Sequence, residues 1–541
     1  SAGWSSVASC SAAGDMSRSH VVSSVAALLL AAAGAAGTPA GVRTCAALTG
    51  LRLSETTITA AEEVAGPAFA PPDGPEIMDL PPFCRIAAVT KPAIKFEVWL
   101  PLSSWNGKFQ GVGNGGMAGT IGYGSMAAAL RRGYATAGTD TGHVAQGSFD
   151  ASWALGRPDL IADFGHRGLH LTTVNGKAIT KAFYGKRPAH AYYVGCSKGG
   201  QQGLMEAQRY PDDYDGIIAG DPANNWTRFY AGAHLWYSLA TTKDPASYIP
   251  ASHVPLLTDA VNAACDDLDG VHDGVLNDPR ACRFDPAVLT CQPGQDPETC
   301  FTAAQVKAVK DIWAGARTSA GELVYPGLAP GGEAGPGGWA AWVTGTAPSE
   351  GTHSRAADGF FKYMVFDDPN WDFRTFNYDT DVALAVRKVG PLLDAVDPNL
   401  ERLRRHGAKL IVYHGWSDPD ISPLNTIAFY ESVAAAKQGK RTRDEALKST
   451  QEFFRLFMVP GMQHCSGGPA AAAFDMVSEL ETWVEKGVAP ERVIASHSTN
   501  GAVDRTRPLC VYPKAAVYTG AGSTDDAANF ECRTPGAGAT R

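Results

Sequence analysis

The feature that most constrains this fold is a serine in a glycine-rich turn between a strand and a helix. Residues 191–194 predict a buried strand and residues 200–209 have helical character; between them lies Gly195-Cys196-Ser197-Lys198-Gly199. Small residues beside the serine permit a sharp turn that lifts its oxygen out of the sheet edge, and the following helix N-terminus favours developing negative charge. The sequence therefore predicts Ser197 as a nucleophile.

Strand and helix patterns alternate around this turn, which indicates a parallel sheet covered on both faces. The alternation stops after Asp221 and resumes near residue 405, and the interval is rich in Gly, Pro, Trp and Cys. We therefore expect an α/β-hydrolase fold whose core comprises residues 37–221 and 405–541, with a large inserted lid domain at 222–404. The expected strands are 94–100, 108–112, 134–138, 191–194, 216–219, 409–414 and 452–459, and the expected helices are 125–132, 169–184, 200–209, 423–437 and 471–487.

Two loops in the last third of the chain supply candidates for a catalytic acid and base. In this fold the order along the chain is serine, acid, histidine, each on a loop after a strand. Asp418 and Asp420 follow the strand at 409–414, and His464 follows the strand at 452–459. Either aspartate could hold the imidazole of His464, which would take the proton of Ser197. His414 and His406 lie before or within a strand, so we expect structural roles for them.

Two cysteines flank the proposed catalytic residues. Cys196 precedes Ser197 and Cys465 follows His464. A disulfide requires Cα atoms roughly 4.4–6.8 Å apart, and triad partners bring their neighbours about that close. A bridge would link nucleophile and base; the alternative is two buried thiols.

An oxyanion hole needs two main-chain N–H groups, one from the residue after the nucleophile and one from an earlier glycine-rich loop. Lys198 is the first donor. Gly113-Asn114-Gly115-Gly116 follows the expected strand at 108–112 and fits the second role. We expect Gly116 to be that donor, with Gly115 as the nearest alternative.

An acidic loop lies between Cys265 and Cys282 in the inserted segment. Carboxylates so close repel one another unless a cation lies among them, and oxygen donors without Cys or His favour Ca²⁺. The pattern is not an EF-hand, because the closing Glu is missing. A solvated acidic turn is the alternative. The predicted structural Ca²⁺ ligands are the side chains of Asp266, Asp269 and Asp273 and the carbonyls of Val271 and Val275.

The beginning of the chain predicts export. From Met16 onward, Arg18 and the apolar residues 21–33 have the layout of a secretory signal, with residues 1–15 upstream of it and a mature start near Gly37. Of eleven cysteines, all but Cys10 follow this segment, so disulfides are expected in a secreted or periplasmic protein. No other apolar run is long enough for a membrane span. A net charge of −9 without a basic stripe argues against nucleic acid as a partner.

Together, the motifs G-C-S-K-G-G, H-G-W-S-D-P and Q-H-C and the loop C-D-x-x-D-G-x-x-D-G resemble the tannase and feruloyl esterase family, which includes bacterial mono(2-hydroxyethyl) terephthalate hydrolase. The resemblance implies a serine esterase for small esters of aromatic acids, of feruloyl, galloyl or terephthalate-monoester type. It favours Asp418 over Asp420, and it implies a lid over the active site and calcium in the acidic loop. It also implies five disulfides: Cys45–Cys84, Cys196–Cys465, Cys265–Cys282, Cys291–Cys300 and Cys510–Cys532.

Aromatic residues of the inserted segment match such substrates, since aromatic walls hold a planar acyl group. The candidates for substrate contact are Trp339, Trp342, Phe360 and, for a carboxylate, Arg355. Two other functions use the same residues: a serine peptidase on the same fold, or a calcium-stabilised binding protein with an inactive triad.

Overall fold

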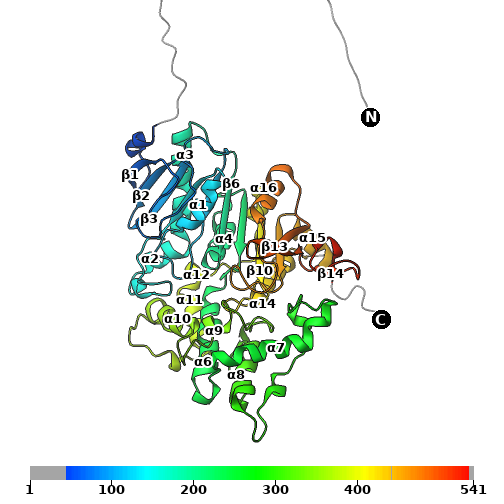
Figure 1. The fold of residues 1–541 in the computed structure, drawn as a ribbon. Coiled ribbons are helices and arrows are strands. Elements are labelled where there is room, and N and C mark those ends of the chain that lie inside the picture. Colours follow the sequence, from blue (N-terminus) through cyan, green and yellow to red (C-terminus); the bar gives the residue numbers. More distant parts are fainter. Residues whose placement is uncertain (1–43, 440, 535–541) are drawn as a thin grey trace, which may run out of the picture. The chain divides into compact units, whose positions relative to one another are not determined.

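A nine-stranded mixed sheet forms the centre of the computed structural model, which describes residues 44–439 and 441–534 (Figure 1). The expected secretory signal lies outside the described residues. The strand order is β1-β2-β3-β5-β4-β6-β7-β10-β11. Neighbours from β1 to β5 pair antiparallel, and the six strands from β5 to β11 pair parallel. The bounds are β1 Thr56–Val64, β2 Phe83–Thr90, β3 Ile94–Pro101, β4 Phe109–Val112, β5 Ala135–Thr139, β6 Ala191–Cys196, β7 Gly216–Gly220, β10 Lys409–Gly415 and β11 Phe454–Val459.

Helices cover both faces of this sheet, as consecutive apolar side chains on the central strands require. Leu410 and Val412 of β10 pack with α3, α4 and α14, whereas Ile411 packs on the opposite face with α16. Helix α1 also covers that second face. The core helices are α1 Tyr123–Arg131, α2 Pro158–Ala162, α3 Gly168–Tyr184, α4 Lys198–Arg209, α14 Pro423–Ala436, α15 Arg443–Gln451 and α16 Met476–Lys486.

The parallel register brings four strand ends to one edge of the sheet. Cys196 at the end of β6 pairs with Gly220 of β7, Gly220 pairs with Tyr413 of β10, and Gly415 of β10 pairs with Val459 of β11. The loops after these strands, which carry the predicted catalytic residues, therefore meet at this edge.

The predicted α/β-hydrolase fold is confirmed, and every strand expected from the sequence is present with ends shifted by a few residues. Strands β1 and β2 were not predicted, nor were two C-terminal hairpins. The hairpin strands are β12 Arg492–Thr499, β13 Ala502–Cys510, β14 Ala515–Tyr518 and β15 Phe530–Arg533. In β1 and β13 the buried and exposed positions do not alternate regularly along the strand, so a pattern of period two is weak there.

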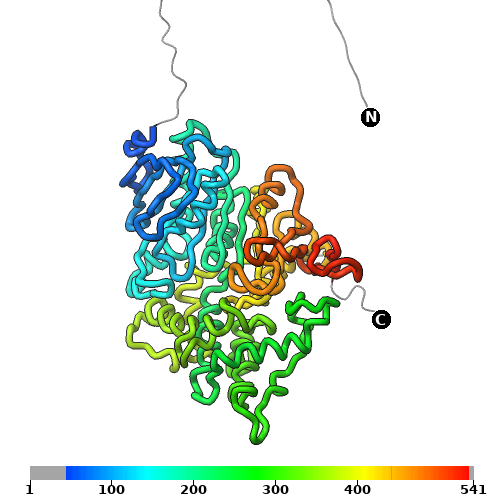
Figure 2. The backbone as a smooth tube through the Cα atoms, in the orientation of Figure 1, coloured from blue at the N-terminus to red at the C-terminus, as the bar shows by residue number. Residues whose placement is uncertain are grey.

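The inserted segment, residues 222–404, adds no strand to the nine-stranded sheet among the described residues. It contains short helices around an aromatic-rich core and is coloured green to yellow in Figure 2. Its α-helices are α5 Trp226–Phe229, α6 Ser238–Thr242, α7 Val254–Cys265, α8 Ala303–Ala314, α9 Trp339–Trp342, α10 Thr352–Phe360, α11 Asp381–Lys388, α12 Gly390–Leu393 and α13 Glu401–His406. It also has a two-stranded sheet of β8 Ala316–Arg317 and β9 Leu323–Tyr325, and π-helical turns η4 Tyr230–Tyr237 and η11 Phe361–Phe366.

This segment packs on the sheet edge that carries the loops of the predicted catalytic residues. The side chain of Gln463, beside His464, donates to Ala334 O at 2.8 Å and accepts from Gly337 N at 3.1 Å. Ser422, on the loop after β10, donates to Gly327 O at 2.6 Å. The inserted segment is therefore in direct contact with the loops that hold His464 and Asp418.

All five expected disulfides are confirmed: Cys45–Cys84, Cys196–Cys465, Cys265–Cys282, Cys291–Cys300 and Cys510–Cys532. Within the described part of the chain, no helix has the length and apolarity needed to cross a membrane.

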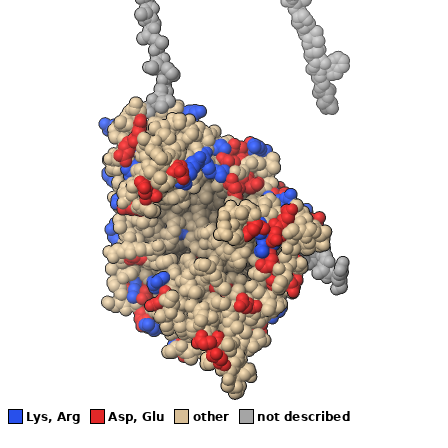
Figure 3. All heavy atoms as spheres, viewed as in Figure 1, with Lys and Arg blue, Asp and Glu red and all other residues tan. Residues whose placement is uncertain are grey.

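Figure 3 shows acidic and basic side chains intermixed on one face, which is hollowed near its centre.

Candidate active site

The turn between β6 and α4 holds Ser197 in a backbone conformation that few non-glycine residues adopt. Its φ is 64° and its ψ is −121°. The turn is fixed by a hydrogen bond from Ser197 N to Gly220 O at 3.0 Å. A Cβ atom at Gly195 would lie 2.6 Å from Gly199 O, so glycine is required there. Strain of this kind persists where surrounding structure enforces it, and it projects the serine from the sheet edge.

His464 and Asp418 form a close pair on the neighbouring loops. His464 Nδ1 lies 2.8 Å from Asp418 Oδ2. The other carboxylate oxygen of Asp418 accepts from the main-chain N–H groups of Asp420 at 2.8 Å and Ile421 at 3.0 Å. Asp418 is thus held by its own loop and can fix the tautomer that leaves Nε2 of His464 free for proton transfer.

Charge pairing shifts the pKa values of both partners. Burial would raise the pKa of Asp418, but the charges and hydrogen bonds of His464 and His414 hold it well below its ordinary value. Burial would lower the pKa of His464, but the charge and hydrogen bond of Asp418 outweigh it and raise that pKa. The pair therefore stabilises an imidazolium, as a general base must.

Asp420, the rival acid in the sequence, lies on the other side of the imidazole. Its Oδ2 is 3.7 Å from Nε2 of His464, whereas Asp418 contacts Nδ1. Its Oδ1 is 3.1 Å from Nε2 of His353 in the inserted segment. Only Asp418 is in hydrogen-bond range of the catalytic imidazole, so its geometry suits the orienting acid.

Asp221 is a functional candidate that sequence reasoning missed. It is fully buried after β7, and its carboxylate accepts from Gly415 N at 2.8 Å and Cys465 N at 2.6 Å. Burial raises its pKa to about 6, against the opposing charges of His414 and His464. One side chain therefore ties the acid loop to the histidine loop. Its place directly after a parallel strand, at the edge that carries Ser197, was the available signal.

The histidines expected to be structural are placed differently from one another. His414 is fully buried at the end of β10, with its Nδ1 2.7 Å from Thr426 Oγ1 and its Nε2 3.3 Å from Asp418 Oδ2. His414 is therefore a second histidine beside the carboxylate of Asp418, on the buried side of the loop. His406 ends α13, 3.3 Å from Asp212, away from the catalytic loops.

The Cys196–Cys465 disulfide joins the nucleophile turn to the histidine loop. The two Cα atoms are 5.9 Å apart. Sγ of Cys465 lies 3.8 Å from Nε2 of His464. Because Cys196 is bonded directly to Ser197 in the chain, the bridge restrains the separation of the serine and the catalytic imidazole.

The loop predicted to supply the second oxyanion-hole donor begins against the nucleophile turn, at Gly113. A Cβ atom on Gly113 would be 2.6 Å from the Cα of Gly199, so the two backbones are in close contact. Gly116 has a φ of 53°, and a side chain there would collide with Ser148 O. The hydrogen bonds of this loop among the described residues use the N–H groups of Gly113, Asn114, Met117 and Ala118, and include none from Gly116 or from its alternative Gly115.

The main-chain N–H group and the side chain of Lys198 lie in different surroundings. Lys198 is the first residue of α4, where a helix leaves its N–H without an intrahelical partner. Its side chain points away into the protein: Nζ donates to Phe164 O at 3.0 Å and to Gln201 Oε1 at 2.5 Å, and lies 4.1 Å from the centre of the Phe164 ring. Burial lowers the pKa of this ammonium well below its ordinary value.

The four candidate substrate contacts fall in different environments. The ring of Trp342 lies 5.2 Å from that of His464 in an edge-to-face arrangement. Trp339 and Phe360 are 1% and 0% exposed within the core of the inserted segment. Arg355 is exposed on α10, with its guanidinium 3.4 Å from Thr352 Oγ1. Of these four residues, Trp342 is the one whose ring lies beside the imidazole of His464.

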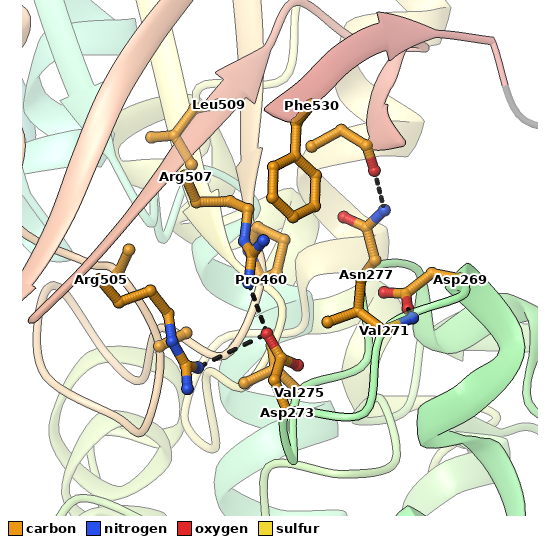
Figure 4. A pocket seen from close by; sticks show the side chains of 13 residues that line it. Asp269, Val271, Asp273, Val275, Asn277, Pro460, Arg505, Arg507, Leu509 and Phe530 are labelled. Carbon is orange, nitrogen blue, oxygen red and sulfur yellow. Dashed lines mark hydrogen bonds and ion pairs between the residues drawn. The ribbon is translucent and has the colours of Figure 1, made fainter. Parts of the chain in front are cut away.

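Four of the five predicted calcium ligands line a common pocket, shown in Figure 4: Asp269, Val271, Asp273 and Val275. Asp266 is buried beside it and accepts from Gly274 N at 2.9 Å and Val275 N at 3.2 Å. Arg507 and Arg505 of β13 approach Asp273 at 2.5 and 3.5 Å.

The chemistry of these donors is that of a hard-cation site, although Arg505 and Arg507 already pair with Asp273. Burial raises the pKa of Asp269 to about 6, with further increases from the nearby charges of Asp273 and Asp266. A cation would relieve this repulsion, and carboxylate and carbonyl oxygens are the donors that Ca²⁺ prefers. Asp266, Asp269 and Asp273, with the carbonyls of Val271 and Val275, are the residues that would hold it.

Comparisons with known proteins agree with this architecture. Residues 80–533 match the family model described as tannase and feruloyl esterase. An uncharacterized esterase of Xanthomonas campestris pv. campestris is 43% identical over 93% of each chain. A probable feruloyl esterase B-2 of Aspergillus oryzae is 32% identical over 83% of this chain and 86% of the relative.

Solved structures give the same result. The crystal structure of feruloyl esterase B from Aspergillus oryzae superposes with a TM-score of 0.81 at 30% identity, covering 89% of this chain and 98% of that one. The tannin acyl hydrolase of Aspergillus niger shares the fold, with a TM-score of 0.72 at 23% identity, covering 89% and 92%. The strand order, the match along residues 80–533 and these relatives lead to one conclusion: the chain belongs to the tannase and feruloyl esterase family and is a carboxylic ester hydrolase.

Proposed function

We propose that this protein is a secreted serine esterase that hydrolyses esters of aromatic acids through an acyl-enzyme on Ser197. One observation carries the proposal: the strained turn of Ser197 is disulfide-linked to the loop of His464, whose Nδ1 lies 2.8 Å from Asp418. A nucleophile, a base and an orienting acid at one edge of a sheet are the parts that acyl transfer requires.

In the first half-reaction, Nε2 of His464 removes the proton of Ser197 as Oγ attacks the ester carbonyl carbon. The negative charge on the carbonyl oxygen is met by the N–H groups of Lys198 and Gly116, the proposed oxyanion hole. The imidazolium, stabilised by Asp418, then gives its proton to the departing alcohol. Asp221 holds the two loops so that Asp418 and His464 keep their relative position.

In the second half-reaction, water replaces the alcohol. His464 takes a proton from the water as its oxygen attacks the acyl carbon, and returns a proton to Ser197 Oγ when the ester bond breaks. The carboxylic acid is released and the serine is regenerated. No step requires a metal, and bound calcium would act by neutralising the carboxylates of the acidic loop and stiffening the inserted segment.

An aromatic acyl group is supported by the ring of Trp342, edge-to-face with the catalytic imidazole, and by Phe149, whose ring centre is 6.3 Å from that of Trp342. The relatives that are named feruloyl esterase also support an aromatic acyl group as the substrate. Five disulfides support export into an oxidising compartment, where the inserted segment would serve as the lid.

The test is labelling with a fluorophosphonate, followed by hydrolysis of methyl ferulate, methyl gallate, a terephthalate monoester and a matched anilide. We expect label on Ser197 only, ester turnover by the wild type, and loss of both in Ser197→Ala. Ser432→Ala, whose Oγ donates to Phe429 O on α14, is the matched control. Ester turnover that survives in Ser197→Ala would refute the mechanism, and faster anilide than ester cleavage would favour a peptidase.

A further inference from the structure

A triad needs one carboxylate on its histidine, yet His464 has two, on opposite ring nitrogens. Asp418 Oδ2 is 2.8 Å from Nδ1, and Asp420 Oδ2 is 3.7 Å from Nε2. Nε2 is the nitrogen that exchanges protons with Ser197 and with water in the proposed mechanism. Asp420 therefore lies beside the reacting atoms, where the orienting role of Asp418 leaves it without an assigned task.

The inserted segment holds Asp420 by its other oxygen. His353 of α10 is fully buried, and its Nε2 donates to Asp420 Oδ1 at 3.1 Å. His234 of η4 is also buried, with its Nε2 3.6 Å from the same oxygen. Asp420 N donates to Asp418 Oδ1 at 2.8 Å. These contacts fix the carboxylate so that Oδ2 faces the catalytic imidazole and remains available to a small molecule.

We propose that Asp420 positions the water that hydrolyses the acyl-enzyme, an inference that rests on the proposed function. That water must give one proton to Nε2 of His464, and its second O–H needs an acceptor. Two atoms 3.7 Å apart can both be reached by one water through hydrogen bonds of about 2.8 Å. Asp420 Oδ2 accepts the second O–H, which directs a lone pair of the water oxygen at the acyl carbon.

The step balances without another reactant. The water oxygen bonds to the acyl carbon, the bond from that carbon to Ser197 Oγ breaks, and the proton taken by His464 passes to Oγ. The second proton stays on the product acid and is only hydrogen-bonded by Asp420. The Asp420 side chain is 5% exposed, which suits a single water better than the alcohol half of an ester.

The role predicts a defect in one half-reaction only. Acylation uses Ser197 as nucleophile and needs no positioned water, whereas deacylation does. In Asp420→Asn we expect the burst of p-nitrophenol from p-nitrophenyl acetate to keep its wild-type rate, while steady-state turnover falls roughly 10- to 100-fold. Mass spectrometry of quenched enzyme should then find Ser197 largely acetylated during turnover.

Two further variants make the test specific. His353→Ala, which keeps Asp420 but removes its donor, should give a smaller decrease confined to the same step, and it replaces Asp420→Asn if that variant fails to fold. Asp394→Asn removes a partly buried carboxylate, one that accepts from Thr227 at 2.9 and 2.8 Å, and should leave both phases unchanged.

A decrease of burst and steady state by the same factor, or no increase of acetylated Ser197 in Asp420→Asn, would overturn the inference and make Asp420 a structural contact to the inserted segment. Failure of the proposed function looks different: the wild type would not be labelled at Ser197 by the fluorophosphonate. A labelled wild type with normal deacylation in Asp420→Asn would overturn this inference alone.

Discussion

The core and the inserted segment contribute to the same site by different means. In the core, Ser197, Asp418 and His464 each follow a strand of one sheet, and the register of β6, β10 and β11 brings their loops together. In the inserted segment, Trp342 and His353 lie on short helices whose places are set by packing of an aromatic cluster. Substitutions at core site residues should therefore change the chemical step, and those in the inserted segment should change substrate binding, water placement or stability.

The largest effect should come from the core acid. Asp418→Asn should reduce kcat by roughly 10³- to 10⁴-fold with KM nearly unchanged, because an amide cannot stabilise the imidazolium and favours the wrong tautomer. Asp420→Asn is the matched comparison and should be milder. If Asp420→Asn were the more damaging change, the two carboxylates would have exchanged roles.

The same variant predicts a shift in the pH profile. Activity requires neutral His464, whose pKa Asp418 raises, so wild-type kcat/KM should fall below a pH that is higher than for an ordinary imidazole. In Asp418→Asn that acid limb should move to lower pH. Asp420 and Asp221 also face the imidazole and retain part of the increase. An unshifted limb would show that another group titrates.

The disulfide at the core edge should rank second. Replacing Cys196 and Cys465 by Ala should lower kcat roughly 10²-fold, since a displacement of about 1 Å at a catalytic group costs that much. Stability should fall by about 5 kcal/mol in the loop-closure model, because the bridge closes a loop of 269 residues. Both are measured well below the melting temperature of the variant. If the double variant were less stable but kept the wild-type kcat, the bridge would stabilise the fold without positioning the catalytic groups.

Two aromatic residues of the inserted segment should separate binding from stability. Trp342→Ala should raise KM for aromatic esters about 10-fold, which corresponds to about 1.4 kcal/mol, and leave acetyl esters unaffected. Phe360→Ala, in the buried cluster, should lower the free energy of unfolding by about 3–5 kcal/mol with little change in KM of the folded enzyme. The reverse pattern would place the substrate against Phe360.

The smallest effect on activity should come from calcium. Chelation should lower the Tm of the wild type but not of Asp269→Ala, whose pocket lacks one proposed ligand, and kcat below the Tm should stay within a factor of about two. A ligand present at 100 times its Kd stabilises the folded state by about 2.7 kcal/mol. Purified protein without bound calcium, shown by elemental analysis, would contradict the proposed site.

Much of the core could be predicted because the local sequence pattern there also determines which residues lie at the edge of the sheet. A strand, a glycine turn and a helix around Ser197 determine where its oxygen lies, and the strands before Asp418 and His464 do the same. Asp221 was not predicted, although it also follows a parallel strand, because its partners are distant in the chain. Its two hydrogen bonds span 194 and 244 residues, which no local pattern reveals.

The inserted segment resisted prediction for a related reason. Its aromatic residues have no strand register to orient them, so the sequence could not tell that Phe360 and Trp339 pack inward while Trp342 reaches His464. Nor could it tell that Asp418 and Asp420, two positions apart, face opposite nitrogens of one ring. That assignment depends on His353, which is 67 residues from Asp420 in the chain.

The connectivity of the disulfides bears on how this protein can be made. Four bridges join cysteines that are consecutive in the chain. The fifth joins Cys196 to Cys465, and four other cysteines lie between these two in the sequence: Cys265, Cys282, Cys291 and Cys300. If cysteines were oxidised in the order in which they leave the ribosome, Cys196 would pair with Cys265. The next two pairs would also be non-native, and only Cys510–Cys532 would then form correctly. Production therefore calls for a host that reshuffles disulfides, or for oxidation after release of the full chain. Yield of active enzyme should then depend on isomerase supply more than on oxidising strength.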